Sequence, residues 1–411
     1  MIPPTWRYVW NNSADPRVVR AHTLVDAALA VRPRVTLSRP DGAGPMLAYG
    51  GLPQGLTHVL PFMEQRRGTG SHRTLRDTTW ADLIHGGAAL GADILAVGML
   101  RDRVPAQLPQ QSLLLPFRVT LAVPIGPDPQ DVLGRLSRKA RQQHARELRS
   151  HRRTLEVAVG DDDFAFFYED MHRPTMANRH GAAARSEDKD SALVCLFRRG
   201  VLFFLCESGH RVAGMLCRLE GRTLVVRLAG VAHGDDQAYA SGTYLAMYVL
   251  ILQWAAERSL TRVDLSGCEP FLSKGIFQFK RKMHPEVALP GNHFTDKRLI
   301  LRVLRDSPPV RDFLAANPVF AFGQGSGFEA VYFHDEDHPP RLDLRWHCPG
   351  VRERRLVHFD NFLADLPDTA QQLPSTRIFP DDCTRSAGCA ALPDGSTSPG
   401  TYPWSGRLWR R

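Results

Sequence analysis

The sequence predicts an α+β fold with a mixed, mostly antiparallel sheet flanked by helices. One observation is a series of four short apolar segments separated by tight turns, which is typical of antiparallel strands. A second is the predicted helix 242–258 between the strands 223–229 and 262–265, because a connection of this length allows two strands to run parallel. The four antiparallel strands are expected at 192–197, 201–206, 212–219 and 223–229.

Upstream of these strands, helix and strand patterns alternate. Residues 79–90 carry apolar side chains at helical spacing, and a buried strand is expected directly after them at 93–100. The apolar run 113–125 predicts another strand. Residues 1–76 are interrupted by Pro and Gly and show only short strand-like pieces, at 46–49 and 58–62.

Residues 128–153 form the clearest predicted helix. Asp128 is placed as its N-cap and Pro129 at its first helical position. One face is apolar, whereas the rest is basic and contains a single carboxylate, Glu147. The basic residues are Arg135, Arg138, Lys139, Arg141, Arg146, Arg149, Arg152 and Arg153. Solvated faces normally mix charges, so this face suggests contact with a nucleic acid or another phosphate-bearing partner. A plain solvated surface and a clamp for an acidic acceptor are the alternatives.

The remaining elements are a strand at 155–159, a helix that begins at the acidic turn 161–163, and, after the loop 266–274, a strand at 276–283. Beyond these we expect a helix at 299–316 and strands at 329–333 and 342–346. The glycines of 323–327 favour a hairpin turn, and residues 334–338 favour a solvent-exposed loop over a metal site.

The composition is that of an ordinary globular protein. The chain has 411 residues, 52 Lys plus Arg and 43 Asp plus Glu, and a net charge of +9. Its seven cysteines show no disulfide framework. Residues 1–10 do not resemble a signal peptide, and the longest apolar run, 244–254, is too short to cross a bilayer. We therefore expect a cytoplasmic protein without a membrane span.

The start of the helix 242–258 is the first candidate for a ligand site. A helix that begins where a parallel strand pair diverges directs its N-terminal amides into the gap, where a pyrophosphate can bind. Ser241 can cap this helix, Gly242 admits a close phosphate and Thr243 offers a second hydroxyl. An ordinary capped helix without a ligand is the alternative.

Residues 92–285 resemble the GNAT superfamily of N-acyltransferases, and more narrowly its Fem-type branch with two such modules in tandem. The resemblance rests on five local matches, which are 136–141, 164–181, 241–245, 263–267 and 275–280. It implies a degenerate module at 1–125, an intact acyltransferase module at 126–296, a C-terminal α/β extension at 297–366 and a flexible tail at 367–411. It also implies an acyl-CoA donor, or an aminoacyl-tRNA donor as in Fem-type relatives, because the stretch 234–240 lacks the glycine-rich loop typical of acetyl-CoA-binding members.

The resemblance also implies the site residues. Lys280, one of only six lysines, would lie near the donor and stabilise the oxyanion, and Asp264 would orient the amine or accept its proton. Ser241, Gly242, Thr243, Tyr244 and Phe279 would contact the donor, and Arg138, Arg141, Arg179 and Lys274 would contact phosphate or the acceptor. We expect no metal and no permanently bound cofactor. The acceptor would be an amine-bearing small molecule or peptide, and tRNA is a possible partner. A non-catalytic module that binds RNA or a phospho-ligand is the remaining alternative.

Overall fold

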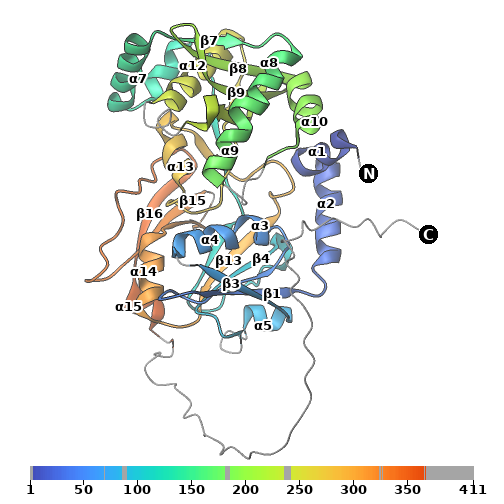
Figure 1. The fold of residues 1–411 in the computed structure, drawn as a ribbon. Helices are drawn as coiled ribbons and strands as arrows, with labels where there is room; N and C mark the ends of the chain where they lie inside the picture. Colours follow the sequence, from blue (N-terminus) through green and yellow to red (C-terminus); the bar gives the residue numbers. More distant parts are fainter. Residues whose placement is uncertain are drawn as a thin grey trace, which may run out of the picture. The chain divides into compact units, whose positions relative to one another are not determined.

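The computed structural model describes residues 3–68, 70–85, 90–180, 186–235, 242–323, 325, 327–364 and 366. In these residues the strands form three sheets, each with one parallel pair among antiparallel ones (Figure 1). The predicted α+β class is therefore confirmed, and the repeated mixed sheet fits a tandem. The expected flexible tail, 367–411, lies outside the described residues, and the division of the rest at 125 and 296 stays a prediction.

The first sheet combines early strands with one late strand. Its order is β3 (Ser71–Asp77), β1 (Arg34–Pro40), β2 (Leu47–Gly51), β4 (Ile94–Leu100), β13 (Lys297–Val303), β5 (Ser112–Pro116). All residues of β13 are buried between β4 and β5, so the prediction of a helix at 299–316 is wrong in its first half. A strand buried on both faces lacks the alternating pattern that would distinguish it from a helix. The helix begins only at Pro308 (α14, Pro308–Ala316).

The second sheet contains the predicted meander and crossover. Its order is β12 (Glu286–Ala288), β6 (Thr120–Pro124), β11 (Arg262–Asp264), β10 (Thr223–Val231), β9 (His210–Glu220), β8 (Gly200–Glu207), β7 (Arg153–Val157). The strands β7 to β10 are antiparallel, and β10 pairs parallel with β11 through the helix α12 (Thr243–Glu257). One predicted strand, 192–197, is wrong, because residues 192–196 form a π-helical turn that buries Ala192, Cys195 and Leu196.

The chain crosses between these two sheets twice. The single strand predicted at 113–125 is two strands, β5 in the first sheet and β6 in the second, joined by residues 117–119. Residues 289–296 bring the chain back from β12 to β13. The two crossings contact each other, because the rings of Phe117 and Phe294 stack with centroids 5.6 Å apart.

Several predicted helices and strands change length or type. The helix predicted at 128–153 is two helices, α6 (Gln130–Arg135) and α7 (Arg138–His151). The backbone of Leu136 is extended, and Ser137 caps α7 by accepting from the Ala140 amide at 3.2 Å. The predicted strand 276–283 is instead the helix α13 (Gly275–Lys280) and a 3₁₀ turn, because Phe277 and Lys280 are buried at helical spacing.

The N-terminal region is more helical than its sequence indicated. It begins with α1 (Pro4–Asn12) and α2 (Pro16–Leu29), and the strand-like piece 58–62 is helical, since α3 (Gly55–His58) and α4 (Leu60–Arg67) meet there. The helix predicted at 79–90 is the short α5 (Trp80–Ile84), and residues 86–89 lie outside the described part. The strand-like piece predicted at 46–49 is confirmed as part of β2, except that Met46 lies just before the strand.

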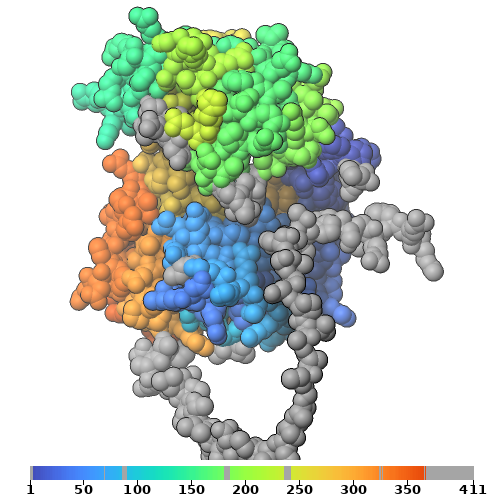
Figure 2. Space-filling view, viewed as in Figure 1, coloured from blue at the N-terminus to red at the C-terminus, as the bar shows by residue number. Residues whose placement is uncertain are grey.

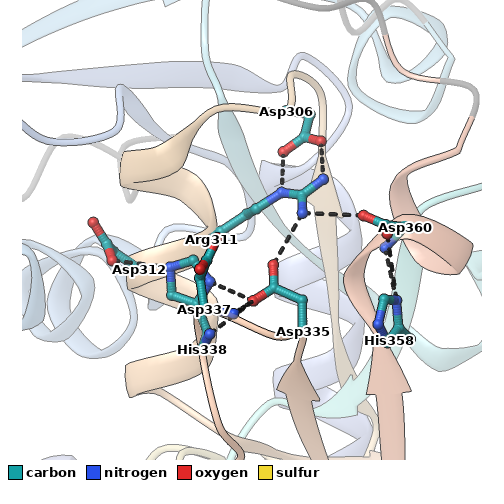
Figure 3. A network of polar contacts seen from close by, with 8 residues as sticks. All are labelled: Asp306, Arg311, Asp312, Asp335, Asp337, His338, His358 and Asp360. Carbon is teal, nitrogen blue, oxygen red and sulfur yellow. Dashed lines mark hydrogen bonds and ion pairs between the residues drawn. The ribbon is translucent and has the colours of Figure 1, made fainter.

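The third sheet follows α14 and contains β14 (Val319–Phe322), β15 (Phe328–His334) and β16 (Val351–His358), which precedes α15 (Phe359–Leu363). The hairpin between β14 and β15 is as predicted, but residues 342–346 are not a strand. Arg311 of α14 holds this region together by contacting Asp306, Asp335 and Asp360 (Figure 3). The loop 334–338 is therefore fastened at Asp335 rather than fully exposed.

Candidate active site

Strands β10 and β11 separate after a short parallel stretch. Their last paired residues are Val225 and Asp264. Immediately beyond, a bulge interrupts β10 between Val226 and Leu228, although β10 continues beside β9 to Val231. The parallel pairing thus stops at the carboxyl end of β11, and β10 continues without it.

A helical segment covers the edge of β10 beyond the last residue that pairs with β11. It consists of a π-helical turn, η3 (Phe167–His172), and α9 (Arg173–His180). His172 Nδ1 donates to the Ala229 carbonyl at 2.8 Å, and the Val231 amide donates to Thr175 Oγ1 at 2.9 Å. Gly230 permits this approach, because a Cβ there would lie 2.5 Å from the His172 main-chain nitrogen. These side chains satisfy main-chain groups that have lost their strand partner.

Asp264 ends β11 beside this opening and is partly exposed. Its carboxylate accepts from the Ser266 amide at 2.7 Å and from Thr120 Oγ1 at 3.2 Å. Both contacts fix its orientation. Thr120 belongs to β6, a partner that no local motif could have indicated.

Lys280 reaches the same turn from α13. Its side chain is only 5% exposed, and its ammonium donates to the Leu265 carbonyl and, at 3.4 Å, to the Ser266 carbonyl. Burial lowers the pKa of Lys280 to about 8. The structure therefore brings the two predicted catalytic residues together at the end of β11, with the ammonium bound to the turn that follows Asp264.

The start of α12 is covered by α7. Gly242 has a φ of +77°, and a Cβ added to it would lie 3.4 Å from Gln143 Nε2 of α7. Thr243 is buried, and its hydroxyl accepts from the Arg153 guanidinium at 3.3 Å. Tyr244 is also largely buried, whereas Ser241 lies outside the described residues.

The family of this segment follows from a comparison with known proteins. Residues 137–281, which contain the strand divergence, α12 and α13, match the family described as an acetyltransferase (GNAT) domain. These residues are a GNAT acyltransferase domain. The expected superfamily and the expected enzyme class are thereby confirmed for this part of the chain.

Solved structures with a similar course of the chain were also found. FemX is 11% identical with a TM-score of 0.37 over 65% of this chain and 83% of its own. The C-terminal domain of a putative lysylphosphatidylglycerol synthetase from Agrobacterium fabrum is 12% identical, with a TM-score of 0.31 over 73% and 90%. L-PGS from Bacillus licheniformis is 12% identical, with a TM-score of 0.32 over 74% and 97%. No curated protein matches the sequence.

The predicted phosphate contacts of the GNAT domain are mostly on its surface. Exposed basic residues line α7, and Arg179 is exposed on α9. The exposed basic residues of α7 are Arg138, Lys139, Arg141, Arg146 and Arg149. Arg153 does not belong to this surface, because it is 5% exposed and pairs with Glu207 at 2.7 Å and with Glu147 at 3.5 Å. It is a buried link between α7, β8 and the start of α12.

Lys274 lies in a buried ion network that the sequence did not indicate. Its ammonium contacts Glu269 at 2.7 Å, and Arg118 and His58 contact the same carboxylate at 2.9 and 3.5 Å. Burial works against ionisation of Glu269, but the hydrogen bond with His58 and the charges of Arg118 and Lys274 hold its pKa well below the ordinary value. Lys274 is therefore engaged within the protein. The network joins α3, the 117–119 crossing and the start of α13.

A second buried cluster lies at the return crossing. His22, Asp26 and His293 place metal-ligand atoms within 4.8 Å of one another. However, the Lys297 ammonium lies 2.7 Å from Asp26 Oδ2 and 2.6 Å from His293 Nδ1. The cluster thus contains its own cation. The pKa of His293 falls to about 2 because it is buried beside Lys297, and the pKa of Asp26 falls to about 2, since its bonds to His22 and Lys297 outweigh its burial.

Proposed function

We propose that the GNAT domain transfers an acyl group from an acyl-CoA-type thioester to an amine, without a permanently bound cofactor. The supporting observation is the end of the β10–β11 pairing at Asp264, where Lys280 reaches the turn after β11 from α13. Tyr244 and Phe279 are proposed for the donor side, and Phe279 packs on α12 through Tyr248, with ring centroids 5.6 Å apart. Because α7 covers the start of α12, the donor would bind beside the turn that follows β11, where Asp264 and Lys280 meet.

In the proposed reaction, Asp264 accepts a proton from the incoming amine. The amine nitrogen attacks the acyl carbon, a C–N bond forms, the C–S bond breaks, and the thiolate leaves and recovers a proton. Lys280 remains largely protonated at neutral pH, because its pKa of about 8 is above 7. It holds the turn and supplies positive charge near the developing oxyanion.

An aminoacyl-tRNA donor, as in Fem-type enzymes, is the second candidate. The exposed basic face of α7 favours this donor, because it holds five cationic side chains. Among the described residues only one of the five contacts a carboxylate, Arg146 with Glu147 at 3.5 Å. Such a surface suits a polyanion such as tRNA, and it carries more positive charge than binding of a small thioester requires. The acceptor in both cases is an amine-bearing small molecule or a peptide.

The donor is tested by incubating the purified chain with labelled acetyl-CoA or with pools of charged tRNA, each with an amine acceptor mixture. We expect label transfer from acetyl-CoA that resists ribonuclease. Transfer only from tRNA would refute the thioester proposal and support the Fem-type one. Transfer from neither donor, together with salt-sensitive RNA binding that is lost when Arg138, Arg141 and Arg149 become Gln, would refute both.

The role of Lys280 is tested against a neighbouring lysine. Lys280→Ala is expected to reduce transfer by about a hundredfold or more, as removal of an oxyanion contact does. Lys282→Ala is the matched control, because Lys282 is exposed two residues further on. Full activity in a folded Lys280→Ala variant would remove Lys280 from the site.

A further inference from the structure

The first two helices expose an unusual amount of apolar surface. The described residues include sixteen exposed large hydrophobic side chains, and seven of these fall between residues 6 and 31. They are Trp6 (74% exposed), Val9 (44%), Trp10 (37%), Leu24 (65%), Val25 (44%), Leu29 (55%) and Val31 (66%). Single exposed apolar residues are ordinary, but a concentration of this kind marks an interaction surface.

On α2 the exposed apolar residues follow helical geometry. Ala21, Leu24, Val25, Ala28 and Leu29 are all exposed, and their spacing places them along one face. The opposite face is buried through Val19, His22 and Asp26. The buried side, which includes the polar His22 and Asp26, packs against the rest of the protein, whereas the apolar side faces outward.

The charge on this face is of one sign. Arg17, Arg20 and Arg32 are exposed, and in the described part of the chain no ion pair involves them. Asp26 is the one carboxylate of α2, and it is 1% exposed and paired with Lys297 at 2.7 Å. The outer face of α2 is thus apolar and cationic and has no carboxylate of its own, although the exposed Asp15 caps the N-terminus of the helix.

Both helices are firmly held, so this face is a fixed feature of the fold. His22 of α2 stacks between Trp10 and His293, with centroid distances of 4.7 and 3.8 Å. In α1, Tyr8 is buried against the helical segments of the GNAT domain, and Arg218 lies 4.4 Å from its ring centroid. Figure 1 shows α2 along one side of the molecule, and α1 lies at the end of α2 next to α10 (Lys189–Ser191).

We propose that the outer face of α1 and α2 docks on an anionic membrane surface. Tryptophan rings favour the headgroup level, exposed leucine and valine can enter the acyl boundary, and arginines attract lipid phosphates. The lack of exposed carboxylates on α2 matches a negatively charged surface. This attachment is peripheral and does not depend on the chemistry of the GNAT domain.

Vesicle sedimentation of the full chain tests the proposal, using phosphatidylcholine vesicles and phosphatidylcholine vesicles with a quarter phosphatidylglycerol. We expect binding to the anionic vesicles that weakens at high salt. Leu24→Gln/Leu29→Gln should weaken it by about tenfold. The matched control is Leu342→Gln/Leu356→Gln, whose leucines are 43% and 44% exposed elsewhere, and it should bind normally.

A triple change of Arg17, Arg20 and Arg32 to Gln is expected to weaken anionic binding by roughly a hundredfold, at about fivefold for each arginine. Thermal unfolding of every variant should match that of the unmodified protein, because the changed side chains are exposed. No binding to anionic vesicles, or equal loss in the Leu342→Gln/Leu356→Gln control, would overturn the proposal. So would a dimer that Leu24→Gln/Leu29→Gln dissociates, which would assign the face to a second copy of the chain.

Discussion

Replacing Lys297 by Met should destabilise the protein strongly. The ammonium is fully buried and contacts the Asp26 carboxylate at 2.7 Å, and that carboxylate is 1% exposed. In Lys297→Met the aliphatic volume is nearly retained, but Asp26 loses its counter-ion in the interior. Breaking a buried pair from one side costs about 3–5 kcal/mol, and we expect this fall in the free energy of unfolding.

The assay is urea unfolding of single and double variants at neutral pH. Lys297→Met/Asp26→Asn should recover at least half of the loss, because the second change removes the unpaired charge. Lys282→Met is the control for an exposed lysine and should change stability by less than about 0.5 kcal/mol. A loss below about 1 kcal/mol in Lys297→Met, or no recovery in the double variant, would refute the reasoning.

Three further predictions concern the fold and the site. The pKa of His293 falls from 6.5 to about 2 on folding, so its contribution to stability is full above pH 6.5 and falls by about 1.4 kcal/mol per pH unit below it. Burial also lowers the pKa values of His144 and His172, so His293→Asn should reduce the slope of stability against pH in acid-titration unfolding without abolishing it. Gly230→Ala should cost about 1–3 kcal/mol in chemical unfolding through its clash with the main chain of His172, whereas Gly134→Ala in α6, with open space around its Cβ, should not. Arg311→Met should lower the unfolding free energy by about 1–3 kcal/mol, because Asp306, Asp335 and Asp360 lose the guanidinium that they share; an unchanged urea midpoint would contradict this.

Local patterns predicted the part of the fold that depends on local geometry. The meander from β8 to β10 and the crossover through α12 are joined by short turns and one periodic helix, so sequence spacing determines them. The meeting of Asp264 and Lys280 was also predicted, although by resemblance to the family rather than by spacing. Lys280 lies on a helix and not on the predicted strand. The apolar run around Phe277 is compatible with both a strand and a helix, so its pattern could not distinguish them.

The buried charges could not be predicted, because their partners are distant in the chain. Arg118 and Glu269 are 151 positions apart, and Asp26 meets Lys297 from the other end of the described chain. A charged residue in an apolar run gives no sign of which carboxylate it will meet. The same holds for Arg153, which the sequence placed on an exposed basic face and the fold buries beside Thr243.

The position of β13 determines the order in which the protein can be completed during synthesis. β4 and β5 do not pair with each other, since β13 occupies the place between them, and β13 follows the whole GNAT domain in the chain. A ribosome must therefore deliver residues 117–296 before the N-terminal sheet can close. Until then β4 and β5 each have an unpaired edge, which is a hazard for aggregation. The GNAT domain is in this sense an insertion between strands of the N-terminal sheet, and a fragment cut after residue 125 would lack β13, the strand that joins β4 to β5.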